Sequence, residues 1–206
     1  MKHRIKPAMR FKRWEIALAI GLLVSLALGY RAEAAANRLE ASLVRLHVVA
    51  DGDSTEQQTL KLAVRDAVLE LTQPALEGVS ERGEAEQRLT ALLPEIEDAA
   101  RKTIRLTGQE LPVTVSLEPE DFPTREYDTF ALPAGTYLSL RVAIGSGQGQ
   151  NWWCVVFPPL CTAASVEELA ETDALSDDDR RFVTRDGTRY VIRFKLVEFW
   201  EKLRGK

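Results

Sequence analysis

The sequence predicts an α+β fold, a single domain in which N-terminal helices pack on an antiparallel sheet, after an N-terminal signal or anchor segment. Three observations support this prediction. Apolar residues recur at helical spacing between residues 60 and 104, they alternate at strand spacing after residue 111, and residues 16–30 carry no charge. A length of 206 residues suits one domain with a tail.

The N-terminal segment, residues 1–36, has the layout of a signal peptide or signal anchor. Residues 1–34 carry seven basic and two acidic side chains, a net charge of +5, whereas the rest carries 20 basic and 29 acidic ones, a net charge of −9. The uncharged run is about 22 Å long as a helix, against roughly 30 Å for a hydrocarbon core. Alanines at 32, 34, 35 and 36 offer cleavage sites. Whether the segment is cleaved or retained, the acidic body is exported.

The first half of the exported body is predicted to be mainly helical. Residues 37–42 form a polar connector, and the exported domain follows over residues 43–206. The run LVRLHVVA at 43–50 predicts a strand that ends in a turn, with Asp53 as the N-cap of the next helix. A second helical pattern follows, which is either kinked or divided into two helices at Pro94.

The second half is predicted to form strands and connecting loops. The glycine-rich run at 145–150 lacks the third glycine and the following helix of a dinucleotide site, so dinucleotide binding is disfavoured. Near the end of the chain we expect a short acidic helix at 165–174 and a terminal helix at 189–203. The expected strands are residues 113–117, 136–144 and 152–157.

Few residues of the exported body suit catalysis. His47 is its sole histidine, so a histidine-dependent hydrolase would have to use it, with Asp51 or Asp53 as its partner. Two cysteines exclude a four-cysteine zinc site, and we expect neither a metal nor a cofactor. The negative charge of the body disfavours nucleic acid as a partner. A non-enzymatic protein is therefore favoured, and a hydrolase using His47 is the alternative.

The segment at 151–161, NWWCVVFPPLC, has the most unusual composition in the chain. Neighbouring strand residues face opposite sides, so one of Trp152 and Trp153 can lie in the core while the other is exposed for protein recognition. Burial of both is the alternative. Cys154 and Cys161 lie within reach of each other, and export would favour a disulfide, whereas two buried free thiols are the other possibility.

Several segments together resemble the stage II sporulation protein R family. The block NWWCVVFPPLC carries most of the resemblance. The similarity extends over residues 43–161, more than half of the chain, and is weaker in the last 45 residues. Further matching segments are RLHVVADGDS at 45–54, QQTLKLAVRDAV at 57–68, LPEI at 93–96, FPT at 122–124 and LPAG at 132–135.

This resemblance implies a role in endospore formation. Members of the family are made in the forespore and exported to the intermembrane space. There they act as a signal that triggers stage II sporulation protein GA, the membrane-embedded aspartyl protease of the mother cell, which processes the sigma-E precursor. The resemblance implies no enzymatic activity, and we expect membrane contact only through the N-terminal segment. The candidate partner contacts are Trp152, Trp153, Phe157 and Pro158, with Cys154 and Cys161 as a disulfide brace.

Overall fold

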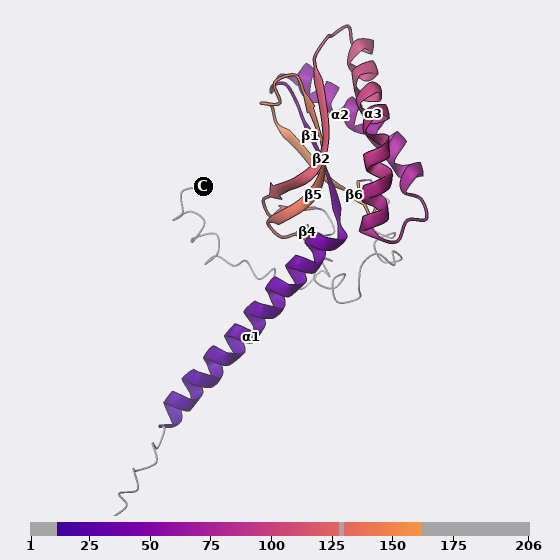
Figure 1. Ribbon diagram of the computed structural model, residues 1–206. Helices are drawn as coiled ribbons and strands as arrows, with labels where there is room; N and C mark the ends of the chain where they lie inside the picture. Colours follow the sequence, from indigo (N-terminus) through magenta and orange to yellow (C-terminus); the bar gives the residue numbers. More distant parts are fainter. Residues whose placement is uncertain (1–11, 128–129, 162–206) are drawn as a thin grey trace, which may run out of the picture.

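The computed structural model describes residues 12–127 and 130–161 and confirms the α+β class (Figure 1). Helices α2 and α3 cover one face of a sheet, and α1 projects away from the body. The predicted helices at 165–174 and 189–203 lie outside the described residues. The elements are α1 (Arg13–Ser42), β1 (Val44–Val49), α2 (Thr55–Leu76), α3 (Arg82–Leu106), β2 (Val113–Phe122), β3 (Arg125–Glu126), β4 (Ala131–Leu132), β5 (Gly135–Ile144) and β6 (Asn151–Phe157).

The main sheet has the strand order β2-β5-β1-β6, and a separate pair is formed by β3 and β4. β2 pairs antiparallel with β5, and β6 pairs antiparallel with β1, but β1 and β5 are parallel. The sheet is therefore mixed, where we expected antiparallel pairing. A parallel neighbour needs a long crossover, and α2 and α3 lie in the chain between the two strands. Strand periodicity alone does not encode this pairing.

The helix boundaries differ from the predicted ones for local reasons. The N-cap of α2 is Ser54, whose Oγ accepts a hydrogen bond from the Gln57 amide at 3.2 Å, so the predicted N-cap at Asp53 is wrong by one residue. Asp53 instead accepts a hydrogen bond from the Gln150 amide at 2.7 Å. α3 runs through Pro94 as one helix, so the chain does not divide there.

The face of the sheet under α2 and α3 holds the larger apolar core. Alternation along each strand directs every second side chain toward the helices. Complete burial of one such aliphatic side chain stabilises the fold by about 1.5–3 kcal/mol. Fully buried members of this cluster are Val44, Leu46, Val48, Val64, Val68, Leu89, Ile96, Leu140 and Val142.

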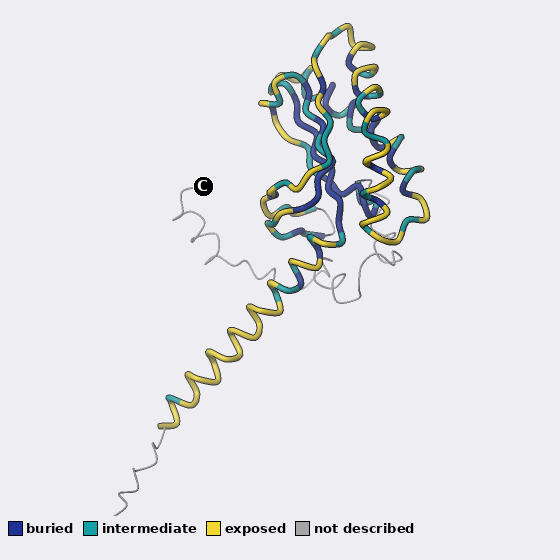
Figure 2. Tube along the Cα trace, in the orientation of Figure 1, coloured by how far each residue is buried: buried dark blue, intermediate teal, exposed yellow. Residues whose placement is uncertain are grey.

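Helix α1 has an exposed part and a docked part. Its 30 residues extend about 45 Å, and the large apolar side chains from Trp14 to Tyr30 are exposed (Figure 2). By length and composition, this helix is able to cross a membrane. The predicted connector at 37–42 is wrong, since the helix continues to its end at Ser42. Alanine favours helix, and Leu39 is fully buried against the body.

Candidate partner-binding face

The second face of the sheet, opposite α2 and α3, carries polar and aromatic side chains. β1 lies near the middle of the sheet, and alternation directs its Arg45 and His47 to this face. Their cross-strand neighbours are Ser139 and Arg141 on β5 and Val155 and Trp153 on β6. We call this surface the second face and define it by Arg45, His47, Glu120, Phe122, Arg125, Tyr137, Ser139, Arg141, Trp153 and Val155.

Arg45 is a fully buried guanidinium in the middle of the second face. Its Nη2 donates to the Tyr127 hydroxyl at 2.6 Å, and its Cζ lies 4.1 Å from the Phe122 ring centroid and 5.1 Å from that of Tyr137. Its Nε and Nη1 are buried without a hydrogen-bond partner. Burial lowers the pKa of Arg45, an effect that the two tyrosines oppose. Burial also raises the pKa of Tyr137.

His47 is held from both sides of its ring. Its Nδ1 lies 2.9 Å from Glu120 Oε1, and its Nε2 lies 2.8 Å from Asn151 Oδ1. Each ring nitrogen therefore lies within hydrogen-bonding distance of a side-chain oxygen. Glu120 Oε1 also lies 3.6 Å from Arg141 Nε. The predicted alternative partners Asp51 and Asp53 instead bind backbone amides of the loop at 145–150.

Trp152 and Trp153 are both half-buried and lie on opposite faces of the sheet. Trp153 is on the second face, where the Arg125 guanidinium stacks 3.5 Å from its ring centroid. Trp152 is on the helix-covered face, where Arg65 stacks at 4.3 Å. Arg65 also donates to Asp66, from Nε at 2.8 Å and from Nη2 at 2.6 Å. An arginine thus stacks on each tryptophan ring. Arg65 forms an ion pair with Asp66, whereas Arg125 forms no ion pair within the described residues.

The other residues of the aromatic block are placed inside the fold. Phe157 packs in the helix-side core, and Pro158 is also buried, so neither presents a free surface to a partner in this structure. Their role as contacts stays a prediction. Cys154 and Cys161 form a disulfide with Cα atoms 5.3 Å apart, which closes the turn after β6.

Three residues of this face, Arg45, Glu120 and Arg125, were not predicted from the sequence as functional candidates. One indication of Arg45 was available, because a charged residue within a strand rich in valine and leucine is unusual. Glu120 and Arg125 gave no such indication, since they contact His47 and Trp153, which lie far from them in the sequence.

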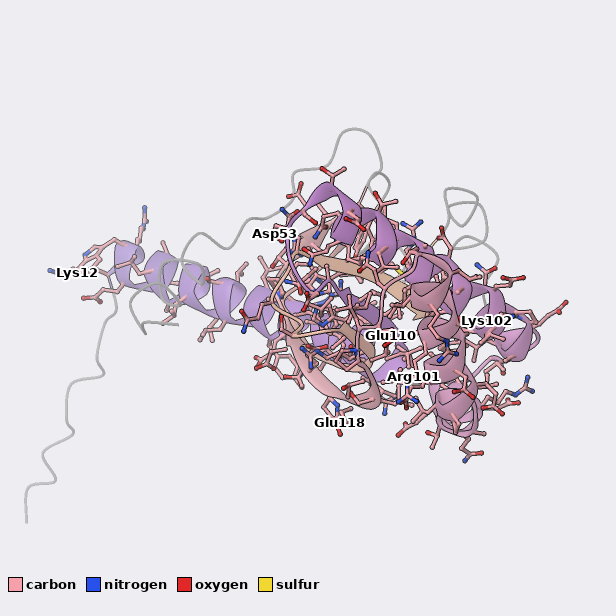
Figure 3. The ribbon with its side chains drawn as sticks, turned by 90° about the horizontal axis from the view of Figure 1, so that it is seen from above. Lys12, Asp53, Arg101, Lys102, Glu110 and Glu118 are labelled. Atoms are coloured by element: carbon pink, nitrogen blue, oxygen red, sulfur yellow. A yellow bond between two sulfur atoms is a disulfide. The ribbon has the colours of Figure 1, made fainter. Side chains whose placement is uncertain are left out.

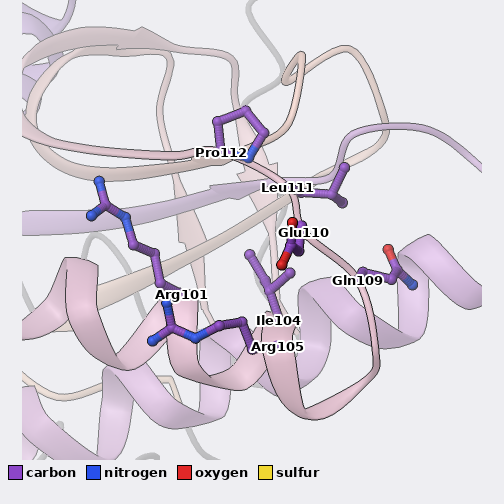
Figure 4. Close-up of a pocket in the computed structure, with 7 residues that line it drawn as sticks. All are labelled: Arg101, Ile104, Arg105, Gln109, Glu110, Leu111 and Pro112. Atoms are coloured by element: carbon purple, nitrogen blue, oxygen red, sulfur yellow. The ribbon is translucent and has the colours of Figure 1, made fainter.

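A shallow groove lies at the C-terminal end of α3, on the helix side of the sheet (Figure 4). Figure 3 shows that Arg101 and Lys102 of α3 lie on the side of the body away from α1, whose far end is marked by Lys12. The charged groups of this groove are not joined in a network of contacts like that of the second face, so the groove is not the candidate site. Its lining residues are Arg101, Ile104, Arg105, Gln109, Glu110, Leu111 and Pro112.

Comparisons with known proteins agree with the resemblance noted in the sequence. A sequence model of the stage II sporulation protein R family matches residues 40–167. The chain is 35% identical to "Stage II sporulation protein R" of Bacillus subtilis (strain 168) over 196 residues, which is 91% of this chain and 87% of that protein. No solved structure matches the chain.

Proposed function

Because the chain belongs to the stage II sporulation protein R family, we propose that it is a signal exported from the forespore. It activates the membrane-embedded protease that processes the sigma-E precursor, stage II sporulation protein GA or its equivalent, by binding it. A role in sporulation follows from the family. The observation that carries the proposal is the Arg125–Trp153 stack, a rigid and half-exposed aromatic group on a polar face.

The N-terminal helix and the disulfide support an extracytoplasmic site of action. α1 combines a basic flank with exposed apolar side chains, which fits a signal or an anchor. Disulfides such as Cys154–Cys161 persist outside the reducing cytoplasm. Leu39 of α1 belongs to the same apolar cluster as Trp153. A retained anchor would therefore hold the second face near the membrane in which the protease lies.

Binding activates a protease only when the ligand has a higher affinity for the active state than for the inactive one. The second face suits this requirement because its aromatic and charged groups are held by fixed partners. Such preorganisation lowers the entropy lost on binding and favours one partner geometry. This face also belongs to rigid strands, which position its groups better than a loop would.

The geometry at His47 supports binding better than hydrolysis. A hydrolase would need one ring nitrogen free to accept a proton from a nucleophile. Each nitrogen of His47 lies within hydrogen-bonding distance of a side-chain oxygen, that of Glu120 or Asn151, and the predicted carboxylates Asp51 and Asp53 hold a loop. We therefore do not advance the hydrolase as a second proposal.

The test compares Trp153→Ala with the control Trp152→Ala in sporulating cells. These residues are adjacent on β6 but lie on opposite faces. The two variants therefore make the same change to the same strand and differ only in the face that loses a tryptophan. We expect Trp153→Ala to abolish sigma-E processing while the protein is exported and keeps its melting temperature. Trp152→Ala is expected to retain processing once the results are corrected for protein level. Equal loss in both variants would contradict the proposal.

A second measurement separates binding from hydrolysis. Wild-type protein is expected to co-purify with the membrane-embedded protease after export. If His47→Ala still co-purifies with the protease at the wild-type level but no longer supports processing, a chemical role for His47 would replace the binding role.

A further inference from the structure

The second face carries positive charge that no carboxylate of the described residues compensates. Within the described residues, neither Arg45 nor Arg125 forms an ion pair. Nε and Nη1 of Arg45 and Nε of Arg125 are also buried without a hydrogen-bond partner. A buried guanidinium in this state destabilises the fold. Arg45 is fully buried and Arg125 is half-buried, and retention of both without a compensating charge on one face indicates that they have a use in the bound state.

The two arginines act on the same part of the face. Tyr127 accepts a hydrogen bond from Arg45 and donates one to the Trp153 carbonyl at 3.4 Å, while Arg125 stacks on the Trp153 ring. Arg125 is close enough that its charge adds to the lowering of the Arg45 pKa, after the larger effect of burial. Arg45 therefore contributes a fixed positive potential beside Arg125.

The Glu120 carboxylate on the same face is already engaged. Glu120 binds His47 through both carboxylate oxygens and lies near Arg141. Glu120 is therefore not available to Arg125 or Arg45, and neither arginine has an ion-pair partner among the residues that the structure describes.

The neighbouring tryptophan provides an internal comparison. Arg65 stacks on Trp152 and uses the edge of its guanidinium to bind Asp66. Arg125 stacks on Trp153 in the same way, but its edge binds no carboxylate of the described residues. Stacking uses the face of a guanidinium and leaves its edge N–H groups available to a planar anion. The pair Arg125–Trp153 thus repeats the stack of Arg65 on Trp152, but the described residues supply no carboxylate in the place that Asp66 takes beside Arg65.

We propose that Arg125, stacked on Trp153 and supported by Arg45, binds a carboxylate of an acidic segment of the partner protein. This inference rests on the proposed function, because it names the chemistry by which the receptor is recognised. The chain after residue 34 has a net charge of −9, so most of the exported body repels an acidic partner whereas this face attracts it. The partner thereby docks in one orientation.

The test introduces an amine in place of the guanidinium. Arg125→Lys keeps the charge, and a carbodiimide joins a lysine amine to a carboxylate in direct contact, whereas arginine does not react. The full exported chain is coupled in its complex with the membrane-embedded protease, and the linked peptides are identified by mass spectrometry. We expect a link from position 125 to an aspartate or glutamate of the protease. Arg65→Lys is the matched control and is expected to link to Asp66 within the chain.

A binding measurement accompanies the coupling. Charge reversal in Arg125→Glu is expected to weaken binding to the protease by about thirtyfold or more, and Arg65→Glu by far less. A link from position 125 to the acidic residues at 165–179 of the same chain would overturn the inference. So would no link at all, or a requirement of Arg125 only for binding to phosphatidylglycerol vesicles. In these cases the wild-type protein still binds the protease, whereas failure of the proposed function appears as no wild-type binding.

Discussion

The two faces of the sheet differ in whether their arginines are paired with a carboxylate. Under α2 and α3, the strands present aliphatic side chains, and the arginine that stacks on Trp152 is neutralised by Asp66. On the second face, Arg45 is fully buried and Arg125 stacks on Trp153, both without an ion pair in the part of the chain that the structure describes. We therefore expect the first face to contribute most to stability. We expect the uncompensated charge of the second face to lower stability, which is typical of surfaces that carry function.

The largest effect is expected in the core of the helix-covered face. Leu140→Ala removes a fully buried side chain and should lower the free energy of unfolding by about 2–5 kcal/mol. Its neighbour Ser139 is also buried but faces the other side, and its hydroxyl has no hydrogen-bond partner. Urea unfolding of Ser139→Ala should therefore show little loss. If both variants lost similar amounts of unfolding free energy, the helix-covered face would not be the main source of stability.

The disulfide is expected to contribute the next largest effect. Cys154 and Cys161 close a loop of eight residues, which in the chain-entropy model stabilises the fold by about 2.5 kcal/mol. The double variant Cys154→Ser with Cys161→Ser should lose this amount in urea unfolding. Wild-type protein in a reducing agent serves as the control and should lose a similar amount. An unchanged midpoint in reducing agent would show that the bond does not brace the end of β6.

Removal of the buried charge should separate stability from function. Arg45→Met keeps an apolar stem of similar length and removes an unpaired guanidinium, so we expect a gain of about 1–3 kcal/mol in unfolding free energy. The same variant should reduce sigma-E processing, since the positive potential beside Arg125 is lost. A variant that is less stable than the wild type would mean that Arg45 is a structural group, contrary to our account of the second face.

The smallest effect concerns the loop at the end of the sheet. Hydrogen bonds from the backbone amide and the hydroxyl of Ser146 lower the pKa of Asp51 below its ordinary value of 3.8. Because the folded-state pKa is lowered, the stabilisation is present above 3.8 and is lost as the pH falls through the lower folded-state value.

An NMR titration of the Ser146 amide checks this loop. The amide should shift below pH 3.8 in the wild type and not in Asp51→Asn. Gly145 has a positive φ of 59° beside this carboxylate, so Gly145→Ala should disturb the same loop. An identical titration in wild type and Asp51→Asn would exclude the proposed contact.

The elements of the fold could be predicted from local patterns, but the second face could not. Alternation over β5 and helical spacing over α2 depend on neighbouring residues, and both elements formed where expected. The partners of His47 are 73 and 104 positions away in the chain, so no local pattern brings them together. The parallel pairing of β1 with β5 escaped prediction for the same reason.

The aromatic block was predictable in part. Adjacent positions on a strand placed Trp152 and Trp153 on opposite faces, as the structure shows. Phe157 and Pro158 were grouped with them by composition, yet both are buried, because the end of β6 and the disulfide-closed turn lie against the core. The boundary of α1 was also misplaced, since burial of Leu39 depends on packing against distant strands.

The most direct test of the proposed binding role of the second face is sigma-E processing in sporulating cells that carry Arg125→Glu or Arg65→Glu. Both variants reverse a charge that stacks on a tryptophan of β6, but only the first acts on the second face. We predict that Arg125→Glu loses processing while export and melting temperature stay normal, and that Arg65→Glu retains it. Normal processing in Arg125→Glu, or equal loss in both variants, would contradict the account.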